Sequence, residues 1–234
     1  MALIEIQDVS KAYVSEGGRV FALSEASLCL AEGELVAIMG PSGSGKSTLL
    51  SIMGGLNPPT SGRLLVDQID VYALSGERQA DFRHEYVGFV FQQLQLLPYL
   101  TALENVMLPL AISRLPLADR SRLAREALAR VGLADKGGRL PGALSGGEQG
   151  RVAVARAIVN DPPLVLADEP TGSLDSQTGV QVMRLLRSLA DDGLAVVVVT
   201  HNEDNASYAD KLIQLHDGRI QSVVNRARVA LEAV

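Results

Sequence analysis

Nine residues, 40-GPSGSGKST-48, have the composition and spacing of a phosphate-binding loop. They follow the apolar run 35-LVAIM-39, which is typical of a buried strand, and lead into the helix-like run 48-TLLSIMGGL-56. A loop of the pattern G-x-x-x-x-G-K-[ST] in this setting directs backbone N–H groups at a phosphate and adds the partial positive charge of a helix N-terminus. The sequence therefore predicts a nucleoside triphosphate site. The alternative is a glycine- and serine-rich turn that matches the pattern by chance.

Each part of this phosphate loop has an expected role. Backbone N–H groups from Ser42 to Ser47 are expected to surround a β-phosphate, and Lys46 is expected to reach the β- and γ-oxygens. The hydroxyl of Ser47 is expected to ligate Mg²⁺. The residues predicted to bind nucleotide here are Gly40, Ser42, Gly43, Ser44, Gly45, Lys46, Ser47 and Thr48.

Two adjacent carboxylates, Asp168 and Glu169, follow the apolar run 164-LVLA-167. At a strand end near the phosphate loop, Asp168 would hold Mg²⁺, largely through its waters. Glu169 would point at the water in line with the γ-phosphate and act as general base, a role typically worth about 10²–10⁴ in rate. The alternative is a solvated acidic turn before Pro170.

The stretch 144-LSGGEQGR-151 places two adjacent glycines at the start of the helix-like run 152-VAVARAIV-159. Each glycine loses more backbone freedom on folding than any other residue. Bare backbone at a helix N-terminus suits a second anion site. The alternative is an N-capping serine followed by a glycine turn.

The elements that must position these residues follow an α/β pattern. Short apolar runs separated by turn signals lie at residues 3–6, 27–30, 35–39 and 64–66. Two later runs, 164-LVLA-167 and 195-AVVVV-199, are continuous enough to be central strands of a parallel sheet. Helical spacing at 119–131 and 177–190 predicts helices, the second of which would complete a βαβ unit. Ligands of such sheets lie beyond the carboxyl ends of the strands.

Composition narrows the class of protein. The 234 residues are enough for a sizeable core, and the net charge of −6 argues against a surface that coats nucleic acid. The single cysteine, Cys29, excludes an internal disulfide, and its apolar neighbours predict an inert buried thiol. The N-terminus lacks the pattern of a secretory signal, so a cytosolic compartment is expected.

The segment from Leu94 to Ile112 is long and apolar enough to suggest a membrane span. Glu104 and the two prolines Pro98 and Pro109 make spanning improbable. Two readings stay open for this segment: a buried lobe, or an apolar surface that docks onto another protein.

With these motifs together, 144-LSGGE-148 resembles the signature motif of the ATP-binding cassette (ABC) family. The family's other motifs have counterparts in 91-FQ-92, 168-DEP-170, 173-SLD-175 and 200-TH-201. The resemblance covers residues 3 to 220. It implies a P-loop NTPase fold with a RecA-like parallel-sheet core, an N-terminal antiparallel β-subdomain and an inserted α-helical subdomain. Residues 1–234 would form one domain, with the core at about 1–92 and 158–234 and the helical subdomain at about 93–157.

The resemblance also implies a head-to-tail homodimer. Each ATP would lie between the phosphate loop of one copy and Ser145, Gly146 and Gly147 of the other, with Glu148 among the binding residues. ADP lacks the γ-phosphate, so hydrolysis would loosen the dimer. Asp175 matches the loop that crosses the dimer interface.

The roles of three further residues carry over by position. Tyr13 would stack on adenine, and Gln92 would sense Mg²⁺ and the attacking water while contacting a membrane partner. His201 would contact the γ-phosphate. The residues expected to take part in catalysis are thus Glu169, His201, Gln92 and Lys46, and those expected at Mg²⁺ are Ser47, Gln92 and Asp168. His84 and His216 are interpreted as surface residues.

One position departs from the family. Most relatives have glutamine where Gly150 stands, while Arg151 and Arg156 are retained. A glycine inside a helix costs about 1 kcal/mol relative to alanine. We therefore expect an active chain of lower stability.

Three stretches, at 39–62, 86–110 and 167–175, are similar to the ATPases of lipoprotein release, of macrolide and peptide export, and of cell division. This similarity implies an ATPase that powers export or extraction of a lipoprotein, lipid, peptide or drug by a separate membrane permease. The chain would sit peripherally on the cytoplasmic face of the inner membrane, docked through residues 94–112. Whether a periplasmic adaptor joins the complex stays open. No direct contact with cargo or nucleic acid is expected.

Two other functions compete with this prediction. A division-type signalling ATPase would activate an extracytoplasmic partner without moving cargo. A soluble cassette that acts on DNA or ribosomes is disfavoured by the acidic charge and by the lack of a second cassette or a coiled-coil insertion.

Overall fold

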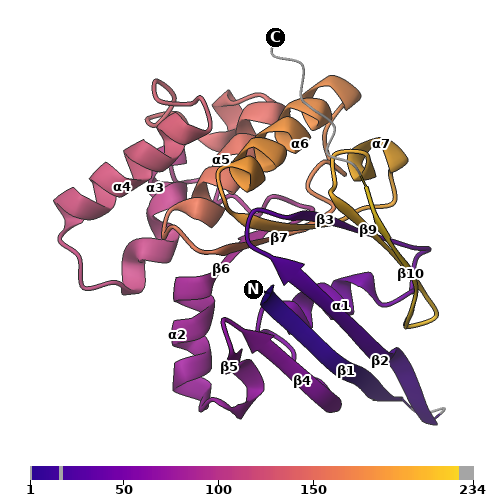
Figure 1. Cartoon of the computed structure of the whole chain (residues 1–234). Coiled ribbons are helices and arrows are strands. Elements are labelled where there is room, and N and C mark those ends of the chain that lie inside the picture. Colours follow the sequence, from indigo (N-terminus) through magenta and orange to yellow (C-terminus); the bar gives the residue numbers. More distant parts are fainter. Residues whose placement is uncertain (1, 16–17, 227–234) are drawn as a thin grey trace.

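Six strands form the central sheet of the computed structural model, which describes residues 2–15 and 18–226 (Figure 1). In spatial order they are β10 (Arg219–Asn225), β9 (Lys211–His216), β3 (Leu35–Met39), β8 (Ala195–Val199), β7 (Leu164–Asp168) and β6 (Val87–Val90). Neighbouring strands are parallel except for the β9–β10 hairpin. Continuous apolar runs form the central strands β3, β7 and β8, because both faces of the sheet are covered there.

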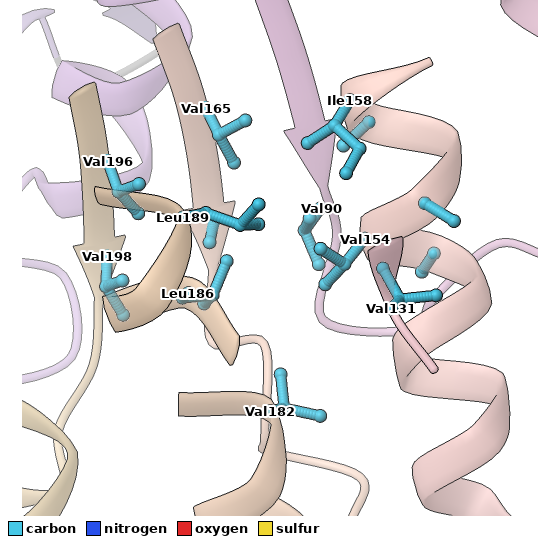
Figure 2. Packing of buried hydrophobic residues seen from close by; sticks show 14 of the residues in the cluster. Val90, Val131, Val154, Ile158, Val165, Val182, Leu186, Leu189, Val196 and Val198 are labelled. Atoms are coloured by element: carbon cyan, nitrogen blue, oxygen red, sulfur yellow. The ribbon is translucent and has the colours of Figure 1, made fainter. Parts of the chain in front are cut away.

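Two helices cover one face of this sheet, α5 (Gly146–Ile158) and α6 (Ser176–Asp191). Figure 2 shows Leu186 and Leu189 of α6 in one buried cluster with Val196 and Val198 of β8. Burial of a side chain of this size contributes about 1.5–3 kcal/mol. The parallel pairing of β7 and β8 with α6 between them in sequence confirms the predicted βαβ unit.

The opposite face is covered by α1 (Lys46–Met53) and then by a four-stranded antiparallel sheet (Figure 1). Its order is β2 (Gly18–Ala31), β1 (Ala2–Ser15), β4 (Ser61–Val66) and β5 (Ile69–Asp70). Ile4 and Ile6 of β1 share one buried cluster with Ile52 of α1 and Ile38 of β3. The predicted α/β class with an N-terminal antiparallel sheet is confirmed.

The strands β1 and β2 are much longer than the runs 3–6 and 27–30 that the sequence indicated. Each has 14 residues, and their pairing contains several register shifts. Asp8 and Glu25 adopt positive φ at these irregularities. Because each shift interrupts the period-two alternation, the polar parts of both strands carry no simple strand pattern.

The remaining helices surround these layers. They are η1 (Val71–Ala73), α2 (Gly76–Tyr86), α3 (Ala102–Met107), η2 (Leu108–Ile112), α4 (Leu117–Arg130), η3 (Pro141–Ala143) and α7 (Glu203–Ala206). The predicted helix at 119–131 corresponds to α4. Figure 1 shows α3 and α4 grouped beside α5, away from the antiparallel sheet.

The apolar segment from Leu94 to Ile112 contains α3 and η2. Val106 and Leu110 are buried, while Tyr99 is 91% exposed and Ile112 is 74% exposed. The segment is therefore partly a buried lobe and partly an exposed apolar surface. Within the described residues, no helix combines the length and apolarity needed to cross a membrane.

Two sequence-based expectations about single residues are wrong. Cys29 is exposed, because it alternates on β2 with the buried Leu30 and so lies on the opposite face of the strand. His84 is half-buried, and its carbonyl accepts a hydrogen bond of 3.1 Å from the Asn160 side chain. His216 is exposed, as expected.

Candidate functional site

A cavity of about 430 Å³ lies at the carboxyl ends of β3, β7 and β8. Its lining residues are Ala22, Gly40, Pro41, Ser42, Gly43, Gly45, Lys46, Ser47, Thr48, Gln92, Asp168, Glu169, Val199 and His201. The fold thus brings most of the phosphate-loop residues together with Gln92, Asp168, Glu169 and His201. The residues predicted from the sequence did not include Ala22, Pro41 or Val199 of this lining. Ala22 comes from β2 and carries no chemical signal that could have identified it.

The phosphate loop takes its shape from glycine at positive φ. Gly45 has φ 101° and precedes α1. A Cβ at Gly45 would collide with the carbonyl oxygen of Ala22, so a larger residue would displace the loop from β2. No side chain caps α1, so its first N–H groups face the cavity end of the helix as donors for an anion.

Lys46 lies across the loop. Its Nζ donates hydrogen bonds of 2.8 Å to the carbonyl oxygens of Gly40 and Pro41. These bonds hold the ammonium group at the cavity wall, where it can meet a phosphate oxygen. Ser44 differs from its neighbours, because its side chain is buried and its N–H donates to the carbonyl of Pro41 at 3.2 Å.

Asp168 and Ser47 meet in the cavity. Burial raises the pKa of the Asp168 carboxyl, while a hydrogen bond from the Ser47 hydroxyl acts in the opposite direction. Among the described residues, no group of three or more His, Cys, Asp or Glu side chains could hold a metal by itself. One carboxylate and one hydroxyl fit Mg²⁺, which is commonly bound by one or two carboxylates together with substrate phosphates and water.

Glu169 and His201 form a pair beside Asp168. His201 Nδ1 lies 2.9 Å from Glu169 Oε1 and 2.8 Å from Oε2. Glu169 has φ 46°, and its N–H donates to the carbonyl of Val199 at 2.9 Å. Left-handed backbone at a non-glycine residue costs about 1–3 kcal/mol, so the bond to β8 holds Glu169 in an unfavourable conformation.

The other predicted site residues lie outside this cavity. They are Tyr13, Ser44, Ser145, Gly146, Gly147, Glu148 and Asp175. Tyr13 stands on the β1–β2 ribbon and is 44% exposed.

Ser145 caps α5 within its own chain. Its Oγ accepts from the Glu148 N–H at 3.2 Å, and Glu148 Oε2 accepts from the Ser145 N–H at 2.8 Å. The second bond lowers the pKa of Glu148. The N-cap alternative considered from the sequence is therefore present in the single chain, and it leaves Gly146 exposed beside the cap.

Packing explains the second glycine. Gly147 is buried, and a Cβ there would lie 2.9 Å from the Thr178 methyl carbon of α6. Thr178 also bonds Asp175, whose Oδ1 accepts from the Thr178 N–H at 3.1 Å and so caps α6. The hydrogen bonds from Thr178 lower the pKa of Asp175. The contact between Gly147 of α5 and Thr178 of α6 therefore links the region of Ser145 to that of Asp175.

Comparisons with known proteins agree with this geometry. The family model described as "ABC transporter" matches residues 23–172. An uncharacterized ABC transporter ATP-binding protein of Thermotoga maritima is 46% identical over 227 residues, which cover 97% of both chains. The lipoprotein-releasing system ATP-binding protein LolD of Geobacter metallireducens is 49% identical over 94% of this chain and 98% of its own length. The macrolide export ATP-binding/permease protein MacB of Salmonella typhimurium is 46% identical over 94% of this chain, which spans 34% of MacB.

Solved structures give the same result. The dimeric structure of MJ0796, described as a bacterial ABC transporter cassette, superimposes with a TM-score of 0.85 at 44% identity and covers 95% of this chain and 98% of its own. A dimeric post-hydrolysis structure of MJ0796 with bound ADP and Pi has the same TM-score at 43% identity, covering 95% and 98% of the two chains. The chain therefore belongs to the ABC transporter family, in which it is an ATP-binding subunit with ATPase activity.

Proposed function

We propose that this ATPase powers export or extraction of a substrate by a separate membrane subunit, through ATP-driven pairing of two copies of the chain. The substrate class would be a lipoprotein, lipid, peptide or drug, as the names of LolD and MacB suggest. One observation carries the proposal. The phosphate loop, Asp168, Glu169 and His201 share one cavity, whereas Ser145 and Gly146 lie outside it in the same chain.

Within one copy, the polar residues of the cavity have roles in hydrolysis. Lys46 and the first N–H groups of α1 bind the phosphates, and His201 contacts the γ-phosphate. Through its bond to Glu169, His201 also orients that carboxylate toward the attacking water. Glu169 accepts a proton from that water as its oxygen bonds to the γ-phosphorus, while the bond from the γ-phosphorus to the β–γ bridging oxygen breaks and ADP leaves. Ser47 and Asp168 would hold Mg²⁺, which would supply positive charge that stabilises the phosphates. Gln92 lines the same cavity and would contact the metal and water.

A second copy would complete the site. The Ser145 hydroxyl and the N–H groups at the start of α5 would donate to the γ-phosphate bound by the partner. Asp175 would approach the same interface from α6, and Tyr13 would stack on the adenine. ATP would bridge two copies and ADP would bridge them less well, because the γ-phosphate is the group that these donors bind. The dimeric forms of MJ0796 support this arrangement.

The variant Glu169→Gln tests the proposal. It removes the proton acceptor but keeps the cavity, so hydrolysis should fall by about 10²–10⁴ while ATP binding persists. In Mg-ATP the variant should accumulate as a dimer, measured by light scattering. As a control, Lys46→Ala in the same background should lose ATP affinity and stay monomeric. A Glu169→Gln chain that binds Mg-ATP and remains a monomer would contradict the proposal.

The membrane subunit would dock onto the apolar surface that residues 94–112 expose, made up of Leu97, Tyr99, Leu108 and Ile112. This placement makes the chain a peripheral protein of the cytoplasmic face of the inner membrane. The proposed division, with the core at about 1–92 and 158–234 and a helical subdomain at about 93–157, fits this role. The chain leaves the sheet after β6, runs through α3 and α4, and returns along α5 to pack against β6.

A further inference from the structure

Asn57 lies beside the exposed aromatic ring of Tyr13. Its Nδ2 donates a hydrogen bond of 2.7 Å to the Tyr13 hydroxyl oxygen. Asn57 begins a short loop, 57-NPPT-60, that connects the end of α1 to β4. Nothing in the phosphate-loop or signature motifs involves this loop, so its contacts need a separate explanation.

The 57–60 loop follows β1 through three more hydrogen bonds. Lys11 Nζ donates to the carbonyl of Pro58 at 2.7 Å, and the Ala12 N–H donates to Thr60 Oγ1 at 3.0 Å. The Thr60 N–H donates to the carbonyl of Ser10 at 2.8 Å. The loop is therefore bonded to four consecutive residues of β1, from Ser10 to Tyr13.

Tyr13 needs such support because of its position in the sheet. The pairing of β1 with β4 ends at Ser10, so at Tyr13 the strand pairs with β2 alone, opposite Val20. A two-stranded ribbon is marginally stable in water. Without further contacts, a ring at its end would sample many orientations.

The other side of Asn57 is anchored in the interior. The Tyr72 hydroxyl contacts the carbonyl of Asn57 at 3.0 Å and the carbonyl of Ile52 at 2.7 Å. Burial raises the pKa of Tyr72, which keeps its hydroxyl protonated as a donor at neutral pH. Asn57 is thus fixed relative to α1, the helix that begins at the phosphate loop.

The Tyr13 ring has one face covered by a cation. Lys11 Nζ lies 5.2 Å from the ring centroid, over one face. The side chain is nevertheless 44% exposed, which leaves part of the ring accessible to a planar ligand. Aromatic rings bind nucleobases by stacking.

We propose that Asn57 is a positioning residue for nucleotide binding, which holds the Tyr13 ring in the orientation on which adenine stacks. This inference rests on the proposed adenine contact of Tyr13. Because Asn57 is tied to α1 as well as to Tyr13, it fixes the base platform relative to the phosphate loop. Its effect should therefore appear only with ligands that carry a base.

Calorimetric titration with Mg-ATP and with Mg-tripolyphosphate tests this inference. Asn57→Ala should weaken ATP binding by about threefold to tenfold, the effect of one net hydrogen bond, and leave tripolyphosphate binding unchanged. Tyr13→Phe removes the other partner and should give a similar loss. The double variant should bind ATP no more weakly than either single variant. Asn57→Asp keeps a partner for the Tyr13 hydroxyl and should restore most of the affinity.

Four results would overturn the inference. Equal losses for ATP and tripolyphosphate in Asn57→Ala would assign Asn57 a purely structural role, as would additive losses in the double variant. Tyr13→Ala separates this inference from the adenine contact, because loss of stacking should weaken ATP binding by about fivefold to a hundredfold. A normal ATP affinity in Tyr13→Ala would remove the adenine contact itself, and with it the role of Asn57. A loss in Tyr13→Ala with none in Asn57→Ala would remove the role of Asn57 alone.

Discussion

The carboxyl group of Asp168 suits the binding of Mg²⁺ but lowers the stability of the ligand-free chain. Burial raises the pKa of its carboxyl, and the hydrogen bond from the Ser47 hydroxyl only partly offsets this effect. The folded chain therefore holds a proton on Asp168 more tightly than the unfolded chain does. Between the ordinary aspartate pKa of about 3.9 and the raised value, the contribution of this group to stability falls as pH rises. At neutral pH the buried carboxylate destabilises the ligand-free chain.

Asp168→Asn should remove this effect. The amide is neutral at every pH and keeps an oxygen that can accept from Ser47. Without Mg²⁺, the variant should melt at a higher temperature than the parent chain at pH 7, and the difference should shrink as pH falls toward about 4. Thermal unfolding across this pH range measures the effect. Asp81→Asn, at an exposed position outside the cavity, is the control for the loss of one carboxylate. An Asp168→Asn variant that is no more stable at pH 7 would show that Ser47 and Lys46 fully compensate the burial.

Single residues also show which parts of the site a sequence can reveal. The types and spacing at Lys46, Asp168 and Glu169 were sufficient to predict a triphosphate site. The pattern S-x-x-E at Ser145 and Glu148 is typical of a capping box, so this cap could be predicted from the sequence. The left-handed backbone of Glu169 was not, because it depends on a bond to β8, which is distant in sequence.

At the scale of elements, the close approach of α5 and α6 changes the interpretation of Gly150. The absence of a side chain at Gly150 lowers helix propensity, but it also leaves room for the neighbouring side chains. A Cβ at Gly150 would lie 3.1 Å from Val182 Cγ2 and 3.3 Å from Leu174 Cδ1. Val182 is fully buried, and β-branched residues in helices have one strongly preferred rotamer. The sequence showed the cost of this glycine but not the neighbouring helix that favours it.

Gly150→Ala measures the balance between these effects. The alanine gains about 1 kcal/mol of helix propensity, whereas overpacking costs about 1–3 kcal/mol. We expect the free energy of unfolding to fall by up to about 2 kcal/mol in denaturant titrations. Gly150→Gln places more atoms at the same position and should not be more stable than Gly150→Ala.

Gly76 supplies a matched control in another helix. It lies in the first turn of α2, with open space around the position of a Cβ. Gly76→Ala should be neutral or stabilising by up to about 1 kcal/mol. If Gly150→Ala stabilised the chain as much as Gly76→Ala, then α5 and α6 would have room to separate and the packing argument would be wrong.

At the scale of the whole molecule, the order of layers could be predicted better than the lengths of elements. The runs at 35–39, 164–167 and 195–199 indicated a covered parallel sheet because all their residues are apolar. The antiparallel layer was indicated only where its residues reach the core, such as Ile4 and Ile6. Its polar half, which carries Tyr13, follows from pairing between β1 and β2 and not from a local pattern. The exposure of Cys29 depends on the same layer, because only the strand's register decides which face meets the core.

Because Cys29 is exposed, it must be replaced before the docking surface is tested by cysteine cross-linking. Cross-linking through introduced cysteines requires Cys29→Ser first, since the native thiol is accessible. Tyr99 is the most suitable position, with 91% of its surface exposed on the apolar segment. Ser222 on β10 gives a control, because it is exposed and β10 lies at the opposite edge of the central sheet from β6.

The Cys29→Ser background with Tyr99→Cys should form a cross-linked product with the proposed membrane subunit, when the two are co-expressed and a thiol cross-linker is added to their membranes. Burial of the apolar side chains at Leu97, Tyr99, Leu108 and Ile112 would drive this contact, at about 25 cal/mol for each Å² removed from water. Ser222→Cys in the same background should give no product. Products from both positions would indicate non-specific capture. If Ser222→Cys alone reacted, the membrane subunit would dock at the other edge of the sheet, and the apolar surface of residues 94–112 would need a different partner.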